Sequence, residues 1–305
     1  MAKSASEKLG IQGLGWIVRR SLQTPASLTP FYQAAFGLRQ LRPAAATGSV
    51  MLWSGDIVMF EANTLVLGSD TLARKGDFDF VFRARNFDAA KAAILKAGAV
   101  VADENHGNGR RLFTRDPDGM SVGLWEAHRD SIFPADAFAD KLWQSGGVTL
   151  PDTPALPSAL QDIASINLKV ADPVAMAVFY HEALGLEILG APKSTGAVLA
   201  LGRTTVLELH PGGVKRDVLK DRNESPDVWI LRVYDHDGLV DRFRSKNVTI
   251  VNQVSITGGK ITYASDPEGH MFGIQQRTRD LLPDGAKDRI EDIVARKLWA
   301  ERTNE

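Results

Sequence analysis

The sequence contains no cysteine, and several other features are missing as well. Without cysteine the chain can form no disulfide, no thiolate nucleophile and no zinc or iron–sulfur site held by sulfur. No apolar run approaches the roughly 18 residues that cross a bilayer, and residues 1–10 lack the hydrophobic stretch of a secretory signal. The formal net charge of −1 gives no excess of positive charge of the kind that binds nucleic acid. We therefore expect a cytoplasmic protein with no nucleic-acid or membrane partner, whose chemistry uses oxygen and nitrogen side chains or a bound ion.

Two motifs occur twice in the 305 residues, at nearly the same spacing. The segment from Phe31 to Leu38 returns as Phe179 to Leu186, 148 residues later (179 − 31 = 148). The turn from Asp116 to Gly119 returns as Asp266 to Gly269, 150 residues later (266 − 116 = 150). A shared offset across most of a domain indicates an internal duplication. The composition, 44% hydrophobic and 24% charged, is that of a globular protein, and the length predicts about two domains.

Each copy divides into two modules of one strand, one helix and three further strands. In the second copy Asp172 and Pro173 begin a helix that stops at Gly185, and the first copy repeats this punctuation around Pro25 and Gly37. Both Asp-Pro motifs have proline and glycine at turn positions, so each predicts an antiparallel hairpin. Further strands and helices are expected at residues 50–53, 56–61, 78–85, 88–96, 100–103, 111–115 and 120–126, and at 165–171, 198–201, 204–210, 228–234, 238–246, 249–254, 260–265 and 271–276.

The copies span residues 11–127 and 161–277. Residues 128–160 are interpreted as a linker with a short helix, and residues 278–305 as a helical tail with an apolar face that packs on a domain or on a partner subunit, which leaves a homodimer open. The charged stretch 215–224 has no single sign and is expected to be a solvated loop.

The four modules, the Phe-Tyr helices and the Asp-Pro hairpins together resemble the vicinal oxygen chelate superfamily, which includes glyoxalase I, bleomycin-resistance proteins and extradiol dioxygenases. The resemblance covers residues 11–127 and 161–277. It implies an α+β fold, a tandem repeat of paired βαβββ modules that form two open, cupped mixed sheets with helices on the outside. It also implies a divalent metal at the floor of a cup, held by His, Gln or Glu on first strands and Glu on last strands.

The positions that match these ligands are mostly occupied by residues that cannot bind a metal. Carried over one by one, they fall in the second copy on Ser165, Glu208, Val228 or Trp229, and Gly273, and in the first copy on Trp16 or Ile17, Glu61, Asp79 and Gly123. An extradiol dioxygenase would carry His, His and Glu where this chain has Ser165, Val228 and Gly273. We therefore expect no metal and no other cofactor, with the backbone at Gly123 and Gly273 open to the close approach of a ligand.

The second copy contains the residues that best fit a reactive site. Glu208 and His210 are two apart on a strand and face one side, so they are candidate catalytic residues for acid–base chemistry, although His210 could also merely cap a solvated rim. Ser165 and Asn167 share the polar face of their strand and either bind a substrate or face water. The remaining predicted substrate-binding residues are Arg232, Gly273 and Gln275.

Three functions stay open on this basis. The first is a protein of this superfamily that binds a small apolar or aromatic organic compound in a metal-free cup, either sequestering it or transforming it by acid–base catalysis. The second is a metal-dependent lyase, isomerase or dioxygenase with one divalent ion on unconventional ligands, such as Glu61, Asp79 and His106, or Glu208 and His210. The third is a structural or protein-interaction module whose cups are filled by their own side chains.

Overall fold

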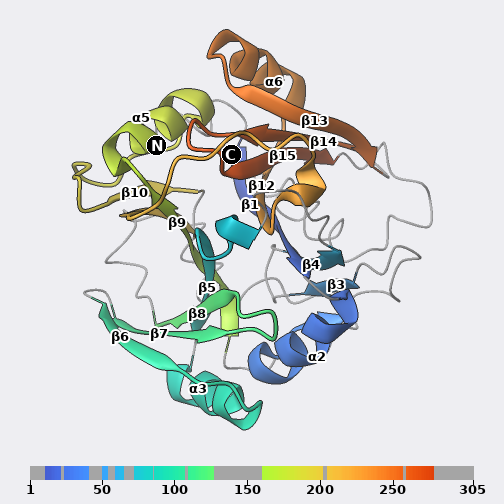
Figure 1. The fold of residues 1–305 in the computed structure, drawn as a ribbon, viewed down its shortest axis with the longest axis vertical. Helices are drawn as coiled ribbons and strands as arrows, with labels where there is room; N and C mark the ends of the chain where they lie inside the picture. Colours follow the sequence, from blue (N-terminus) through green and yellow to red (C-terminus); the bar gives the residue numbers. More distant parts are fainter. Residues whose placement is uncertain are drawn as a thin grey trace, which may run out of the picture.

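Two open mixed β-sheets and four helices make up the part of the chain that the structure describes (Figure 1). The structure is a computed structural model, and it describes residues 11–21, 24–40, 50–53, 59–64, 72–84, 86–106, 109–126, 160–201, 205–256 and 259–277. Figure 1 shows the four helices at the periphery of the molecule, with the sheets between them. The predicted tail at 278–305 and the predicted linker up to residue 159 lie outside the described residues.

The elements follow the predicted module order, and most of their ends lie within a few residues of the predicted ones. The first two modules contain β1 (Ile11–Ser21), α2 (Pro25–Phe36), β2 (Arg39–Gln40), β3 (Val50–Trp53) and β4 (Met59–Thr64), then η1 (Leu72–Arg74), β5 (Phe78–Ala84), α3 (Phe87–Lys96), β6 (Ala102–His106), β7 (Gly109–Arg115) and β8 (Ser121–Trp125). The last two contain β9 (Leu160–Val170), α5 (Pro173–Leu184), β10 (Ala197–Ala200) and β11 (Val206–Pro211), then η3 (Arg222–Glu224), β12 (Asp227–Val233), α6 (His236–Ser245), β13 (Thr249–Ile256), β14 (Gly259–Ser265) and β15 (Met271–Arg277).

The ends of α2 and α5 are set by the residues that the sequence singled out. The Asp172 side chain accepts hydrogen bonds from the backbone N–H groups of Val174 and Ala175, which satisfies two of the donors left open at a helix start. Gly37 and Gly185 end the two helices at φ values of 64° and 67°, in the left-handed region that glycine adopts without steric cost. The helix predictions are confirmed at these positions.

The strand order shows that the sheets do not follow the two copies. One sheet, called sheet A, has the order β13-β14-β15-β12-β1-β4-β3-β2 and joins the first module to the fourth. The other, sheet B, has the order β10-β11-β9-β5-β8-β7-β6 and joins the second module to the third. The expectation that each copy closes its own cup is therefore wrong, because β1 pairs antiparallel with β12 and β5 pairs antiparallel with β9. The limits 11–127 and 161–277 stay a prediction about the duplication.

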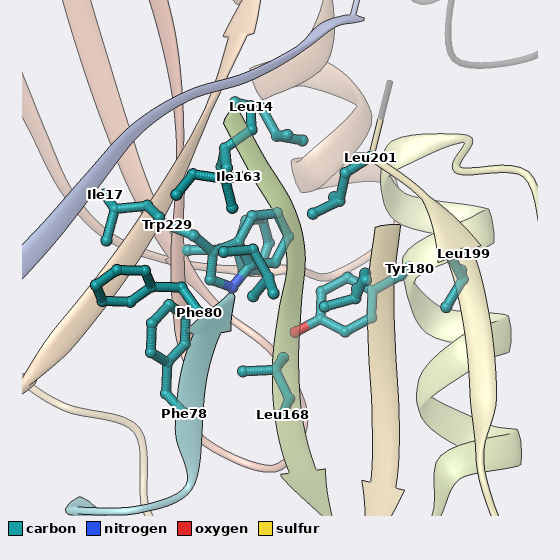
Figure 2. Packing of buried hydrophobic residues seen from close by; sticks show 14 of the residues in the cluster. Leu14, Ile17, Phe78, Phe80, Ile163, Leu168, Tyr180, Leu199, Leu201 and Trp229 are labelled. Carbon is teal, nitrogen blue, oxygen red and sulfur yellow. The ribbon is translucent and has the colours of Figure 1, made fainter. Parts of the chain in front are cut away.

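The main hydrophobic core lies between the sheets and the helices. Figure 2 shows side chains of β5, β9 and β12 packed around one another, among them Phe78, Phe80, Ile163, Leu168 and Trp229. Each fully buried Phe, Leu or Ile contributes about 1.5 to 3 kcal/mol relative to an exposed one, so this face dominates the stability of the fold. The opposite faces of sheets A and B carry two separate, smaller clusters, and these faces are the cups.

The two repeated motifs contact each other across the sheets. The hydroxyl of Tyr32 in α2 donates to Oδ2 of Asp116, in the hairpin between β7 and β8, at 3.0 Å. The hydroxyl of Tyr180 in α5 donates in the same way to Oδ2 of Asp266, between β14 and β15, at 2.7 Å. Each bond ties a helix that follows a strand of one sheet to a hairpin of the other sheet. Both motifs thus hold the sheets together.

The stretch 215–224 is more than a solvated loop, and that expectation is wrong for part of it. Leu219 is 8% exposed and packs in the apolar cluster of sheet A with Trp16 and Val228. The Arg216 guanidinium pairs with Asp77 at 3.0 Å. The mixed composition of residues 215–224 gave no indication that Leu219 and Arg216 make these contacts.

Candidate functional site

The cup of sheet B contains the two predicted catalytic residues. In β11 Glu208 pairs in register with Asn167 of β9, which in turn lies opposite Asp79 of β5. Residues paired across strands project from the same face, so these three side chains share one row. Ser165 lies in the next row, beside Val81. The structure thus brings together four of the polar residues that the sequence proposed.

An ion pair crosses this cup. Nη1 of Arg111 in β7 lies 2.9 Å from Oε2 of Glu208 in β11, and the two side chains are only 2% and 6% exposed. Three strands separate β7 from β11 in the sheet, so the contact requires the sheet to curl. The guanidinium carbon also lies 5.0 Å from the ring centre of Phe113 and 5.1 Å from that of Trp125. Arg111 is therefore held by one carboxylate and by two aromatic rings.

Glu208 also contacts His210, as the alternation along the strand predicts. Nε2 of His210 lies 3.1 Å from the same Oε2 atom, and the His210 side chain is 45% exposed. Burial opposes ionisation of Glu208, but the hydrogen bond from His210 and the charge of Arg111 outweigh it and lower the pKa of Glu208 to about 2. Glu208 is therefore an anion near neutral pH and orients His210. The catalytic roles stay a prediction.

Ser165 and Asn167 are buried and bonded to each other. The Ser165 hydroxyl donates to Oδ1 of Asn167 at 2.9 Å, and the two residues are 0% and 5% exposed. Opposite Asn167, Oδ1 of Asp79 is buried without a hydrogen-bond partner among the described residues. The floor of the cup thus combines a neutral polar pair with an unsatisfied carboxylate oxygen.

The remaining predicted residues lie on the other sheet. Arg232 of β12 pairs in register with Gln275 of β15, next to Gly273, and both strands belong to sheet A. The strand of Glu61, β4, is in sheet A as well, and the side chains of Glu61 and His106 are outside the described part. The assumption that Arg232, Gly273 and Gln275 join Glu208 in one site is therefore wrong, as is the grouping of Asp79 with Glu61. The cup of sheet A contains an apolar cluster of Trp16, Val18, Leu219, Val228, Ile230, Ile261, Tyr263 and Met271. Arg232 is buried on the same face of β12 as Ile230.

The two glycines at the cup floors make room for the protein's own side chains. A Cβ atom on Gly123 would lie 2.9 Å from Cε1 of Phe113 and 2.9 Å from Cγ2 of Val81. A Cβ atom on Gly273 would lie 3.1 Å from Cγ1 of Ile230. The expectation that these glycines open the backbone to a ligand is wrong, because neighbouring strands of the curled sheets fill the space above them.

Comparisons with known proteins agree with this architecture. Residues 17–124 match the family described as glyoxalase-like domain. The structure is similar to that of a putative dioxygenase from Bacillus subtilis, with a TM-score of 0.63, 13% identity, and 97% of this chain and 95% of that chain covered. It is also similar to glyoxalase I from Zea mays, with a TM-score of 0.56, 19% identity, and 87% and 92% covered. This chain has the vicinal oxygen chelate fold. No curated protein matches it in sequence.

The described residues of the cups do not fit the divalent ion that the vicinal oxygen chelate fold implies. Within the described ranges no three His, Asp or Glu side chains are close enough to hold one together. In sheet B the charge of Glu208 is already matched by Arg111 at 2.9 Å, which places a cation at the carboxylate that a metal would need. In sheet A the matching positions Trp16, Val228 and Gly273 provide no donor side chain suited to an ion, and the side chain of the fourth, Glu61, is outside the described part.

Arg111 is the residue that the sequence did not single out. The strand predicted at 111–115 places Arg111 and Phe113 on one face, which is the available signal. Its partner Glu208 is 97 positions away, so only the curl of sheet B reveals the pair. As a separate observation, none of the helices among the described residues has the length and apolar character needed to cross a membrane.

Proposed function

We propose that this vicinal-oxygen-chelate-fold protein binds a small apolar or aromatic organic molecule in the cup of sheet B without a metal ion. The observation that carries the proposal is the buried pair of Arg111 and Glu208, in which a protein cation meets the carboxylate at the cup floor. A second support is the wall of the cup. Phe113, Leu189 and Val198 are partly exposed and pack on its apolar cluster. Partly exposed apolar side chains around a few buried polar groups are typical of small-molecule sites.

Acid–base catalysis at this site is a second candidate function, favoured by the contact between His210 and Glu208. An ionised carboxylate 3.1 Å from Nε2 favours the tautomer with hydrogen on Nε2, which leaves the lone pair on Nδ1 to take a proton. Proton removal from a bound molecule is a step that lyases and isomerases use. Replacing His210 with alanine should then abolish turnover and preserve binding, whereas sequestration predicts no turnover in either protein.

A matched pair of valine variants tests where the ligand binds. Val198 belongs to the wall of sheet B, and Val254 is partly buried against the cluster of sheet A. With the neutral aromatic fluorophore N-phenylnaphthylamine as probe, Val198→Ala should weaken binding by about three- to tenfold, since two methyl groups contribute about 1 kcal/mol or slightly more. Val254→Ala should leave the affinity unchanged. The opposite result would assign the ligand to sheet A, and absence of binding would favour a structural module.

Elemental analysis tests independence from metals. Protein purified without chelator should contain no stoichiometric iron, manganese, zinc or nickel, and probe binding should be the same before and after dialysis against EDTA. A stoichiometric ion whose removal abolishes binding would favour the metal-dependent alternative. A cytoplasmic location and a homodimer stay predictions from the sequence.

A further inference from the structure

Two equivalent clamps join the sheets, and the first is built on Asp116. Its Oδ1 atom accepts hydrogen bonds from the backbone N–H groups of Asp118 at 3.0 Å and Met120 at 2.9 Å. Its Oδ2 atom accepts from the Tyr32 hydroxyl at 3.0 Å and from Nη1 of Arg19 at 3.1 Å. Arg19 belongs to β1 of sheet A, whereas Asp116 lies in a hairpin of sheet B. A carboxylate, a tyrosine and a permanently charged cation thus form this clamp.

The second clamp, on Asp266, has the same pattern with a different cation. Oδ1 of Asp266 accepts from the backbone N–H groups of Glu268 at 2.9 Å and His270 at 2.8 Å. Oδ2 accepts from the Tyr180 hydroxyl at 2.7 Å and lies 2.8 Å from Nδ1 of His270. His270 therefore makes with Oδ2 the contact that Arg19 makes in the first clamp, but it belongs to the same hairpin as its aspartate.

The partners of His270 determine its protonation. Nε2 lies 3.0 Å from the carbonyl oxygen of Lys169 in β9, and a carbonyl oxygen can only accept. Nδ1 faces Asp266, whose other oxygen already receives two backbone N–H groups, as an ionised carboxylate does. Both ring nitrogens must donate. We infer that His270 is a doubly protonated imidazolium that clamps the hairpin of sheet A to the end of β9 in sheet B, and that loss of its proton releases this clamp. The inference does not depend on the proposed function.

The surroundings of His270 keep the proton exchangeable. Its side chain is 10% exposed and lines a cavity of about 30 Å³, room for one or two waters. The charged or titratable groups that face it from every packed element are Asp266, Glu268, Tyr180, Asp77, Arg74, Arg216 and Asp227. Burial disfavours the charged ring, but attraction to Asp266, its hydrogen bond and the charge of Asp77 outweigh burial and raise the pKa of His270. The protonated ring is thus favoured in the folded protein.

Release of the clamp would loosen the junction between β9 and α5. Next to His270 in the hairpin, the Glu268 carboxylate accepts from the backbone N–H groups of Ala171 at 2.5 Å and Asp172 at 3.0 Å. Lys169, whose carbonyl His270 binds, pairs in register with His210 of the candidate site. The clamp therefore connects the protonation of one buried ring to the edge of the cup of sheet B.

The test combines histidine titration with amide hydrogen exchange in the full chain. Because the pKa of His270 is raised, its stabilisation is fully present below the unfolded value, about 6.5, and is lost as pH rises through the folded value. We expect ¹⁵N NMR at pH 6 to show both ring nitrogens protonated. Exchange protection of the Ala171 and Asp172 amides, corrected for the intrinsic rate, should fall with rising pH, by about tenfold for each pH unit between the two pKa values.

Three variants separate the clamp from a passive contact. His270→Gln should give low protection at those amides at every pH, and His270→Arg should give protection that no longer varies with pH. His181→Gln is the matched control, because Nδ1 of His181 lies 2.8 Å from the Leu186 carbonyl oxygen and the ring pairs with no carboxylate in the described part of the chain. This variant should behave as the unmodified protein. A folded pKa of His270 at or below the unfolded value, or protection independent of pH in the unmodified protein, would overturn the inference. If the variants fail to fold, the protonation of the His270 ring nitrogens in the unmodified protein, measured by ¹⁵N NMR, tests the inference by itself.

Discussion

Replacement of Arg111 with methionine removes the guanidinium that pairs with the buried Glu208 carboxylate, and its cost follows from the structure. Glu208 is 6% exposed on its side chain, so water cannot take the place of the guanidinium. The pKa of Glu208 falls from 4.5 to about 2. At about 1.4 kcal/mol for each pH unit this corresponds to roughly 3 kcal/mol, shared between His210 and Arg111 against the cost of burial. Breaking a buried pair on one side typically costs about 3 to 5 kcal/mol. We therefore expect Arg111→Met to lower the free energy of unfolding by about 2 to 4 kcal/mol at neutral pH.

Urea unfolding of four proteins measures this cost. Arg111→Met together with Glu208→Gln should recover part of the loss, because no charge is then stranded. Arg110→Met is the matched control, since Arg110 is an exposed neighbour that pairs with Asp88 and Glu126 at the surface, and it should leave stability nearly unchanged. In the unmodified protein the Glu208 contribution is present above pH 4.5 and is lost as pH falls toward 2, and Arg111→Met should flatten this slope. If the free energy of unfolding of Arg111→Met lies within about 1 kcal/mol of that of the unmodified protein, the change is no larger than for a surface substitution, and the reasoning is refuted.

Two further substitutions test the sheet junction and the cup floor. Burial raises the pKa of Asp227 to about 6, and the charges of Asp116 and Asp79 add to the rise, although Arg19 lies 2.8 Å away. The corresponding pKa in the unfolded chain is 3.8, so between these two values the folded protein holds a proton that the unfolded chain releases. Stability should therefore fall between pH 4 and 6, and Asp227→Asn should remove that part of the slope in urea unfolding; an unchanged slope would contradict the assignment. Gly123→Ala places a Cβ atom 2.9 Å from Phe113 and Val81 and should cost about 1 to 3 kcal/mol, which a variant as stable as the unmodified protein would contradict.

Local chemistry explains why the elements were predictable. Asp172, Pro173 and Gly185 act within one helix, through caps and a left-handed turn, so their meaning does not depend on the rest of the chain. The Asp-Pro hairpins are local in the same sense, with the Gly119 N–H donating to the Asp116 carbonyl oxygen at 2.7 Å. The vicinal oxygen chelate resemblance, which rested on these motifs and their repetition, is confirmed as a fold.

The candidate site was predictable only within a strand. Glu208 and His210 lie two residues apart, so alternation alone places them together, and the structure finds them 3.1 Å apart. Whether Arg111 and Arg232 belong to the site depends on which strands are neighbours in the sheets. The first is brought into the site by the curl of sheet B, and the second is left on sheet A.

The amino-acid order by itself therefore determined the features that depend on a few neighbouring residues, namely the helices and their ends, the hairpins and the alternation of strand faces. It also determined the duplication, because the same local motifs return about 150 residues later. Which modules share a sheet was decided by the tertiary structure, because the four modules present similar strand edges and a backbone hydrogen bond does not depend on side-chain identity. The pairing of modules into sheets also decided which charged residues form ion pairs. An ion pair such as that of Arg111 and Glu208 joins residues far apart in sequence, and it forms only when burial between curled strands removes the water that would otherwise solvate each one.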